Sequence, residues 1–185
     1  MIDKSYIRAR IKARKSLLSE VEREVAASKV FARLEQSAAF IMAERVLMYH
    51  SLPDELSTRE FLEKWSPRKR FHLPRVNGVN LEILPYDRSR LAMGAFHIEE
   101  PQGDATTDIS EIELVVVPAV AYDRKGNRIG RGKGYYDRLL AKSKATKIGV
   151  GYDFQLSSEE FAVEPHDVGV DIVITESQNI IVRHS

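Results

Sequence analysis

The sequence predicts a three-layer α/β/α fold with a mostly parallel, Rossmann-like central sheet. Two apolar runs, Leu114–Val117 and Ile172–Ile174, do not alternate with polar residues, which is typical of strands buried on both faces of a parallel sheet. Helical patterns at 58–65 and 135–142 lie between predicted strands. Helices are therefore expected to connect parallel neighbours and to cover both faces of the sheet.

The first forty residues are expected to be helical. Apolar Ile7, Ile11 and Leu18 recur near the helical period among basic residues, which indicates an amphipathic helix with one solvated cationic face. Ser19 followed by Glu22 matches a capping box, so a second helix should begin there and run towards residue 38.

Strands are expected from residue 45 onward, because short segments rich in β-branched and aromatic residues replace the helical pattern. The expected strands are 45–50, 70–73, 81–86, 114–117, 147–150 and 171–175, followed by a short hairpin strand at 179–183. No internal repeat, low-complexity tract or linker interrupts the chain. One domain spanning residues 1–185 is therefore the economical interpretation.

Composition excludes several functional classes. Lysine and arginine (28) nearly balance aspartate and glutamate (27), so no broad basic field is available for nucleic acid. The absence of cysteine excludes disulfides, thiolate zinc sites and a cysteine nucleophile. The longest near-continuous apolar run, 114–122, is about half of the ~20 residues that a membrane span needs. A cytoplasmic monomer without membrane or nucleic-acid partners is expected.

The most informative segment joins a buried strand to a predicted helix and is rich in glycine. Four glycines occur within nine residues: Gly126, Gly130, Gly132 and Gly134. Each concedes about 0.5–1 kcal/mol of conformational entropy on the scale measured in regular elements, so backbone freedom should serve a purpose here. A glycine loop before a helix directs amide donors and the positive dipole end at one point, which suits a phosphate. Three basic residues add charge: Arg128, Arg131 and Lys133.

Two familiar phosphate-binding patterns do not fit. GxxxxGK[ST] would need a glycine five residues before Gly132 and a Ser or Thr after Lys133. GxGxxG fails because Gly130, Gly132 and Gly134 are spaced by two throughout. By spacing alone, a tight structural loop and a phosphate-binding loop both stay open, and the flanking basic residues favour the second.

A family resemblance becomes specific at 128–137, Arg-Ile-Gly-Arg-Gly-Lys-Gly-Tyr-Tyr-Asp, preceded by Val-Pro-Ala-Val-Ala-Tyr-Asp at 117–123. This block resembles the nucleotide-binding block of the 5-formyltetrahydrofolate cyclo-ligase family. Further matches follow in the same order along nearly the whole chain: Lys4 and Arg8, then Ser51, Glu55 and Thr58, then Glu164 to Asp167, and finally Asp171 to Thr175.

The resemblance implies a ligase that uses ATP to cyclise 5-formyltetrahydrofolate to 5,10-methenyltetrahydrofolate, releasing ADP and phosphate. A formyl amide is a poor electrophile and its oxygen cannot depart as oxide, so phosphoryl transfer to that oxygen is chemically justified. The protein would then align two substrates and stabilise phosphoryl charge. ATP and the folate are the implied partners, with Mg²⁺ as the cofactor.

The family pattern also implies roles for individual residues. The implied ATP-binding residues are Lys4, Arg8, Arg128, Ile129, Gly130, Arg131, Gly132, Lys133, Gly134, Tyr135 and Tyr136. Arg131 and Lys133 are the implied catalytic residues, because they would neutralise the charge of the triphosphate. The implied substrate contacts are His50, Glu55, Arg131, Gly132, Lys133, Gly134 and Tyr135. The implied Mg²⁺ ligands are Asp137 and Asp171.

Plainer interpretations of these residues stay open from the sequence. Asp137 also suits the first turn of a helix and Asp171 a strand-entry turn. Lys4 and Arg8 also suit a solvated helix face, and Glu55 an exposed loop.

The remaining interpretations concern His166, one segment and two rival functions. His166 is assigned no chemistry, and segment 91–101 is interpreted as a lid over the folate. The rival functions are a phosphate-binding sugar isomerase or transferase of similar architecture, and a folate-binding regulator that lacks catalysis.

Overall fold

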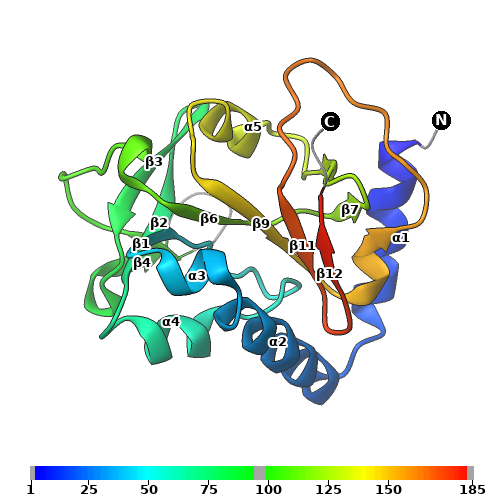
Figure 1. Ribbon diagram of the computed structural model, residues 1–185, viewed down its shortest axis with the longest axis horizontal. Helices are drawn as coiled ribbons and strands as arrows, with labels where there is room; N and C mark the ends of the chain where they lie inside the picture. Colours follow the sequence, from blue (N-terminus) through cyan, green and yellow to red (C-terminus); the bar gives the residue numbers. More distant parts are fainter. Residues whose placement is uncertain (1–2, 94–98, 183–185) are drawn as a thin grey trace.

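The computed structural model describes residues 3–93 and 99–182, and its centre is a seven-stranded sheet in the order β12-β11-β9-β6-β1-β2-β3 (Figure 1). These strands are β1 Arg45–Leu47, β2 Arg70–Asn77, β3 Asn80–Pro85, β6 Leu114–Val117, β9 Thr146–Val150, β11 Ile172–Ile174 and β12 Asn179–Ile181. The five inner strands pair in parallel, and β12 and β3 join the two edges antiparallel. The predicted α/β class with a mostly parallel sheet is confirmed.

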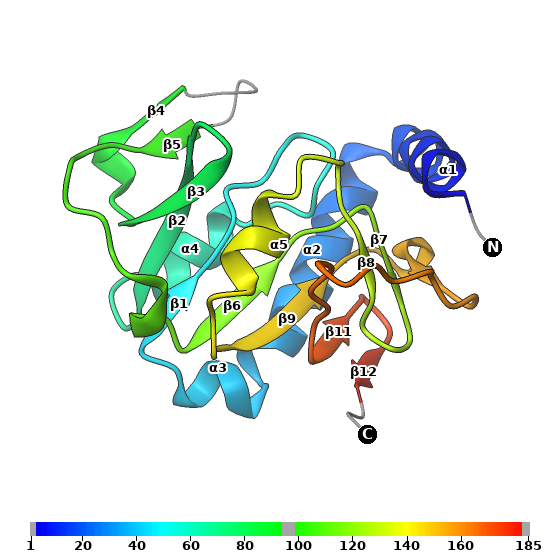
Figure 2. The same cartoon turned by 90° about the horizontal axis from the view of Figure 1, so that it is seen from above.

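Helices cover both faces of this sheet, as expected for three layers. The α-helices of the described part are α1 Lys4–Ser16, α2 Glu20–Glu35, α3 Ala38–Met42, α4 Arg59–Trp65 and α5 Tyr135–Leu140. Helices α2, α3 and α4 lie on one face and α5 on the other (Figures 1 and 2). The helices expected at 58–65 and 135–142 correspond to α4 and α5.

The position of β6 in the sheet explains why its sequence does not alternate between apolar and polar residues. Leu114 and Val116 pack into the cluster beneath α2, α3 and α4, whereas Val115 and Val117 pack into the cluster beneath α5. All four side chains are fully buried. Burying a side chain of this kind contributes about 1.5–3 kcal/mol, so the apolar run is explained by two cores that meet at one strand.

The N-terminal helices are also confirmed. The Ser19 side chain accepts from the Glu22 amide, and the Glu22 carboxylate accepts in turn from the Ser19 amide, so the capping box is formed. Helix α1 stands apart from the other helices (Figure 2). Its Ile11 packs against Val120 and Ile129, so α1 covers the start of the glycine-rich segment.

Part of that segment is a β-hairpin, which the sequence analysis treated only as a loop. Strand β7 Ala121–Asp123 pairs antiparallel with β8 Arg128–Ile129 and parallel with β10 Leu156–Ser157. A separate hairpin joins β4 Leu91–Met93 to β5 Glu99–Pro101.

The turn between β7 and β8 is organised by the carboxylate of Asp123, which is 1% exposed. It accepts hydrogen bonds from the amides of Lys125 (3.0 Å), Asn127 (2.9 Å) and Phe161 (2.8 Å), and from the Asn127 side chain (2.9 Å). A buried carboxylate is tolerated here because four donors satisfy it.

Replacing Asp123 with alanine should lower the free energy of unfolding by about 2–4 kcal/mol, because buried amide donors lose their acceptor. Denaturant unfolding of the variant and the wild type would measure the difference. Asp108→Ala is the matched control, since Asp108 is an exposed aspartate that caps one turn through Ser110. A loss at Asp123 no larger than the loss at Asp108 would contradict the assigned role.

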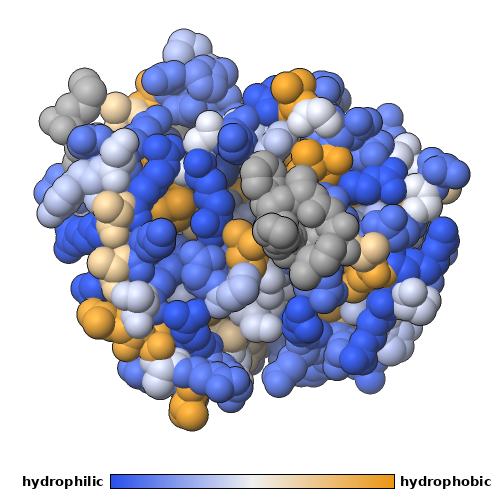
Figure 3. All heavy atoms as spheres, turned by 180° about the vertical axis from the view of Figure 1, so that it is seen from behind, coloured by the Kyte–Doolittle hydropathy of each residue, from blue (hydrophilic) through white to orange (hydrophobic). Residues whose placement is uncertain are grey.

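The side opposite to that of Figure 1 is mainly hydrophilic, and its hydrophobic residues form small separate patches (Figure 3). In the described ranges, no helix has both the length and the apolar character needed to cross a membrane.

Candidate active site at the carboxyl ends of the strands

A cavity of about 610 Å³ lies beyond the carboxyl ends of the central strands. It is lined by residues that directly follow β1 and β6, by side chains of α1, and by the segment 128–137. In open parallel sheets of α/β proteins, ligands bind in the crevice beyond the carboxyl ends of the strands. Topology therefore brings the start of the chain and the glycine-rich segment to one cavity.

The lining combines cationic and apolar groups. The cations of the loop and of α1 are Lys4, Arg8, Arg128, Arg131 and Lys133. The apolar and aromatic lining includes Tyr49, Leu52, Pro74, Val76 and Leu81. Such a lining suits a ligand set that has both anionic groups and flat apolar parts.

The backbone of the loop explains two of its glycines. Gly132 has φ 103° and Gly134 has φ 69°, values that residues with a Cβ rarely adopt. Gly134 is also the N-cap of α5. The carbonyl of Gly130 accepts a hydrogen bond of 2.8 Å from Arg8 Nε, which ties the loop to α1. Arg8 is thus part of the cavity wall and not a solvated surface charge.

Lys4 also lines the cavity, and it contacts an acidic residue. Its Nζ lies 3.8 Å from Asp167 Oδ2. Asp167 in turn lies 3.5 Å from His166, whose side chain is 68% exposed. His166 therefore reaches the rim of the cavity in an acidic, open setting, and the structure adds no chemical role for it.

Arg128 is placed differently from the other basic residues of the loop. Its side chain is only 5% exposed, and its Nη2 lies 2.7 Å from Asp137 Oδ1. Its Nε donates to the Val168 carbonyl at 3.1 Å, while the Val168 amide donates to the same Asp137 oxygen at 3.0 Å. Arg128 thus supports the cavity from beneath, and neighbouring Ile129 is a core side chain at 1% exposure.

The two predicted metal ligands are not brought together at this cavity. Asp137 lines it, with both of the contacts described above falling on Oδ1. Asp171 does not line it: its Oδ2 accepts from the Lys147 amide at 2.8 Å, just before β11 begins. Because β11 runs parallel to β6, a residue before it lies away from the edge where the cavity opens. The donor set therefore fits Mg²⁺ through Asp137 and not through Asp171.

Across residues 3–93 and 99–182, no group of three or more His, Cys, Asp or Glu side chains is arranged to hold a metal. A magnesium ion bound to a nucleotide commonly uses only one or two carboxylates together with phosphate oxygens and waters. Asp137 alone is consistent with that mode of binding.

Glu55 is a partly buried carboxylate in the cavity wall. Its side chain is 11% exposed, and its Oε1 accepts from the Leu52 amide at 2.9 Å. Its Oε2 lies 3.8 Å from Arg131 Nη2. Burial raises the pKa of Glu55 above its usual range, against the effect of the Leu52 amide and the Arg131 guanidinium. The interpretation of Glu55 as an exposed loop acid is not supported.

His50 lines the same cavity and contacts a residue that the sequence analysis did not single out. Its Nε2 lies 3.4 Å from Glu99 Oε2, and its side chain is 7% exposed. Burial lowers the pKa of His50, so the neutral ring is favoured near neutral pH. Glu100 was also missed; it is buried, lines the cavity and accepts from the Val76 amide at 2.7 Å.

No local sequence signal could have revealed Glu99 and Glu100 as wall residues, because contacts with distant residues bring them to the cavity, His50 for Glu99 and Val76 of β2 for Glu100. Both fall in the segment interpreted as a lid, 91–101. Its central part, 94–98 with Gly94 and Phe96, lies outside the described residues.

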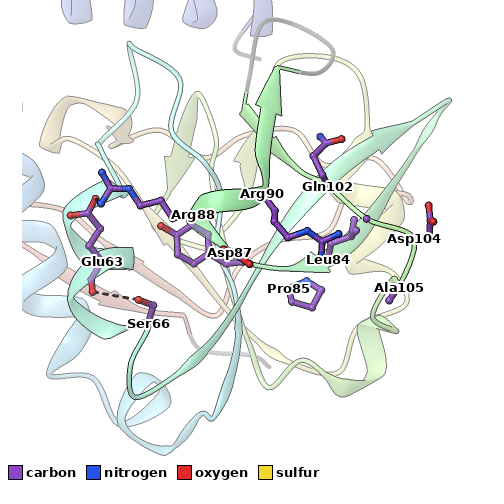
Figure 4. Close-up of a pocket in the computed structure, with 12 residues that line it drawn as sticks. Glu63, Ser66, Leu84, Pro85, Asp87, Arg88, Arg90, Gln102, Asp104 and Ala105 are labelled. Atoms are coloured by element: carbon purple, nitrogen blue, oxygen red, sulfur yellow. Dashed lines mark hydrogen bonds and ion pairs between the residues drawn. The ribbon is translucent and has the colours of Figure 1, made fainter.

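A second cavity of about 680 Å³ lies at the side of β3 and contains none of the predicted site residues (Figure 4). In Figure 4, Arg88 extends towards Glu63, and the two form an ion pair of 2.8 Å. Both side chains are well exposed. The cavity at the carboxyl ends of the strands is therefore the candidate active site.

Comparison with known proteins agrees with the motif that lines this cavity. The model of the 5-formyltetrahydrofolate cyclo-ligase family matches residues 1–176. The chain belongs to this family. The predicted family and the predicted enzyme class, a ligase, are thereby confirmed.

Individual relatives cover almost the whole chain. The 5-formyltetrahydrofolate cyclo-ligase of Escherichia coli K12 is 30% identical over 178 residues, which are 91% of this chain and 97% of the relative. The mouse cyclo-ligase is 26% identical and covers 94% of this chain and 93% of its own. The solved structure of Aquifex aeolicus 5,10-methenyltetrahydrofolate synthetase superposes with a TM-score of 0.89 at 32% identity, over 98% of this chain and 94% of that one.

Proposed function

We propose that this chain catalyses the ATP-dependent cyclisation of 5-formyltetrahydrofolate to 5,10-methenyltetrahydrofolate, with release of ADP and phosphate. One observation carries the proposal: the family motif 128–137 lines the same cavity as Glu55 and the two cations of α1. A single cavity thus holds groups suited to a polyphosphate and groups suited to a pterin.

The chemistry needs both substrates side by side. The γ-phosphoryl group of ATP is transferred to the formyl oxygen, which converts a poor leaving group into a phosphate ester. The second folate nitrogen attacks the activated formyl carbon and loses its proton, and phosphate then leaves with the former formyl oxygen as the ring closes. Alignment and charge stabilisation supply most of the catalysis in transfers of this kind.

Each part of the cavity has a role in this scheme. Lys4, Arg8 and Lys133 neutralise the triphosphate, and the amides of the glycine loop donate to its oxygens. Arg131 stabilises charge on the phosphoryl group in transfer. The Glu55 carboxylate accepts two hydrogen bonds from the amidine-like edge of the pterin. His50 and Tyr49 form the wall beside it.

Mg²⁺ would neutralise charge on the phosphate oxygens, with Asp137 as the protein carboxylate that holds it. Asp171 is left out of this assignment, because it does not line the cavity. Arg128 keeps Asp137 in position from below through the 2.7 Å ion pair.

One assay separates this proposal from its rivals. Purified protein is mixed with ATP, Mg²⁺ and 5-formyltetrahydrofolate, and the methenyl chromophore is followed. Product that depends on ATP supports the ligase. A sugar isomerase or transferase would act without ATP, and a folate-binding regulator would bind the folate without forming product; either result would contradict the proposal.

The pH dependence of folate binding tests the role of Glu55. Protonation removes an acceptor, so the KM for 5-formyltetrahydrofolate should rise as pH falls through the pKa of Glu55. Because burial raises that pKa, the rise should begin at a higher pH than an ordinary glutamate would give. Steady-state kinetics at several pH values measure it.

Glu55→Gln serves as the comparison for this measurement. The variant should have a higher KM that no longer carries this pH dependence, while titration of the substrate itself affects both proteins equally. If the KM of the wild type had the same value as the KM of the variant at every pH, Glu55 would not bind the pterin.

The proposal also includes one domain over residues 1–185, a monomer, and a cytoplasmic location. The lack of linker sequences supports the single domain, and the absence of cysteine fits the cytoplasmic location. Sedimentation of the purified protein across a range of concentrations would test the monomer.

A further inference from the structure

The loop that carries Arg131 does not itself fix the position of the Arg131 side chain. It lies between Gly130 and Gly132, outside any helix or strand, and Gly132 has φ 103°. The Arg131 side chain is 48% exposed. A long cationic side chain on such a loop samples many rotamers unless a partner orients it. A group that holds the guanidinium would therefore affect the rate of catalysis through Arg131.

Asp54 is that partner in this structure. Arg131 Nη2 donates to Asp54 Oδ1 at 3.0 Å and to Oδ2 at 3.3 Å. Glu55, the next residue, is farther from the same nitrogen, at 3.8 Å. Asp54 does not line the cavity, whereas Arg131 and Glu55 do. Asp54 thus binds the guanidinium from outside and leaves the Glu55 carboxylate available to the cavity.

The position of Asp54 is itself supported from α1. Lys15 Nζ lies 3.8 Å from Asp54 Oδ2, and the Lys15 side chain is 5% exposed. A buried ammonium group is costly without a counter-charge, so this contact ties the Asp54 carboxylate to the end of α1. Lys15 does not line the cavity either.

The backbone around Asp54 is tied to the same helix. Arg23 donates from Nη1 to the Pro53 carbonyl and from Nη2 to the Lys15 carbonyl, both at 2.8 Å. Asp54 therefore stands on a segment held to the end of α1 and the start of α2. This gives its carboxylate a fixed position from which to hold a mobile side chain.

We propose that Asp54 is a positioning residue, which orients the Arg131 guanidinium towards the transferring phosphoryl group without touching either substrate. The inference rests on the proposed function. In the absence of Asp54, Arg131 would still be present, but its guanidinium would be spread over several rotamers.

The kinetic test is a double-variant cycle. Asp54→Ala should lower kcat by about tenfold to a hundredfold, the cost of misplacing a catalytic group by about 1 Å, with a KM for 5-formyltetrahydrofolate within about twofold of wild type. In an Arg131→Met background, Asp54→Ala should lower kcat by less than about twofold, because the two residues act as one unit. Asp54→Glu, which keeps the charge, should restore part of the rate. Asp108→Ala is the control aspartate and should leave kcat unchanged.

An equal loss in both backgrounds, or a kcat for Asp54→Ala equal to wild type, would overturn the proposal. Thermal melting of each variant excludes loss of folded protein as the cause. A larger effect on KM than on kcat would likewise contradict a role in orienting Arg131 for phosphoryl transfer.

A second measurement does not depend on activity. Rotation of the Arg131 guanidinium, followed by NMR of its nitrogens in the free protein, should be slow in the wild type and in Asp108→Ala, and fast in Asp54→Ala. If the wild type formed no methenyl product, the proposed function would fail while this readout still tested Asp54. Equal rotation rates in wild type and Asp54→Ala would overturn the inference whatever the enzyme's activity.

Discussion

Replacing Arg131 with methionine should lower kcat of the cyclisation by about 100- to 1,000-fold, the usual cost of removing a preorganised group that stabilises transition-state charge. Arg131 lines the cavity between two glycines, where the proposed reaction would place the transferring phosphoryl group. Methionine keeps much of the length of the side chain but carries no charge. Initial rates at saturating ATP and folate, read from the methenyl absorbance, would measure the loss.

Arg124→Met is the matched control for this change. Arg124 is exposed, donates to Gln178 at 3.1 Å and does not line the cavity. Its replacement should leave kcat within about twofold, as expected for a surface substitution away from the site. Equal losses in the two variants would mean that Arg131 acts only through the overall charge of the protein.

Replacing Arg128 with methionine should lower the free energy of unfolding by about 2–4 kcal/mol, somewhat less than the cost of breaking a fully buried ion pair. The Arg128 side chain is 5% exposed, but its partner Asp137 is 23% exposed and keeps some contact with water. The variant would also lose the hydrogen bond to the Val168 carbonyl. Urea unfolding monitored by far-UV circular dichroism would give the difference.

Two comparison variants make the Arg128 result specific. Lys125→Met breaks an exposed ion pair with Glu160, and a surface pair contributes only about 0–1 kcal/mol. Arg128→Met combined with Asp137→Asn should recover part of the stability lost by Arg128→Met alone, because the unpaired carboxylate is removed. If Arg128→Met were as stable as Lys125→Met, the ion pair would not be a support of the loop.

Local patterns account for much of the fold. The Ser19 and Glu22 capping box and the apolar β6 run each depend on residues near one another in the chain, and both have the predicted structure. The hairpin of β7 and β8 was not predicted, because its turn is polar and contains glycine, as an ordinary loop does. The hairpin is stabilised by the Asp123 carboxylate, which accepts a hydrogen bond from the amide of Phe161, 38 residues further along the chain.

The site was likewise predicted only in part, because some of its contacts join distant segments. The motif 128–137 and Glu55 line one cavity, as their proposed roles require. Asp171 does not, because a position in a motif says nothing about which end of a strand a residue occupies. Asp54 was passed over, although it stands beside Glu55, since nothing in its neighbours indicates a contact with Arg131.

The sequence alone indicated the family, through the resemblance of its motif at 128–137. It also indicated the α/β class and the chemical character of the loop, because hydrophobic periodicity, glycine content and charge are properties of short segments. Only the tertiary structure decided which charged side chains line the cavity and which form ion pairs with one another. Arg128 and Arg131 lie three residues apart in one motif, yet the first is buried against Asp137 and the second points to Asp54 at the cavity rim. That difference arises from packing between distant segments, and burial and pairing set what a charged side chain can do.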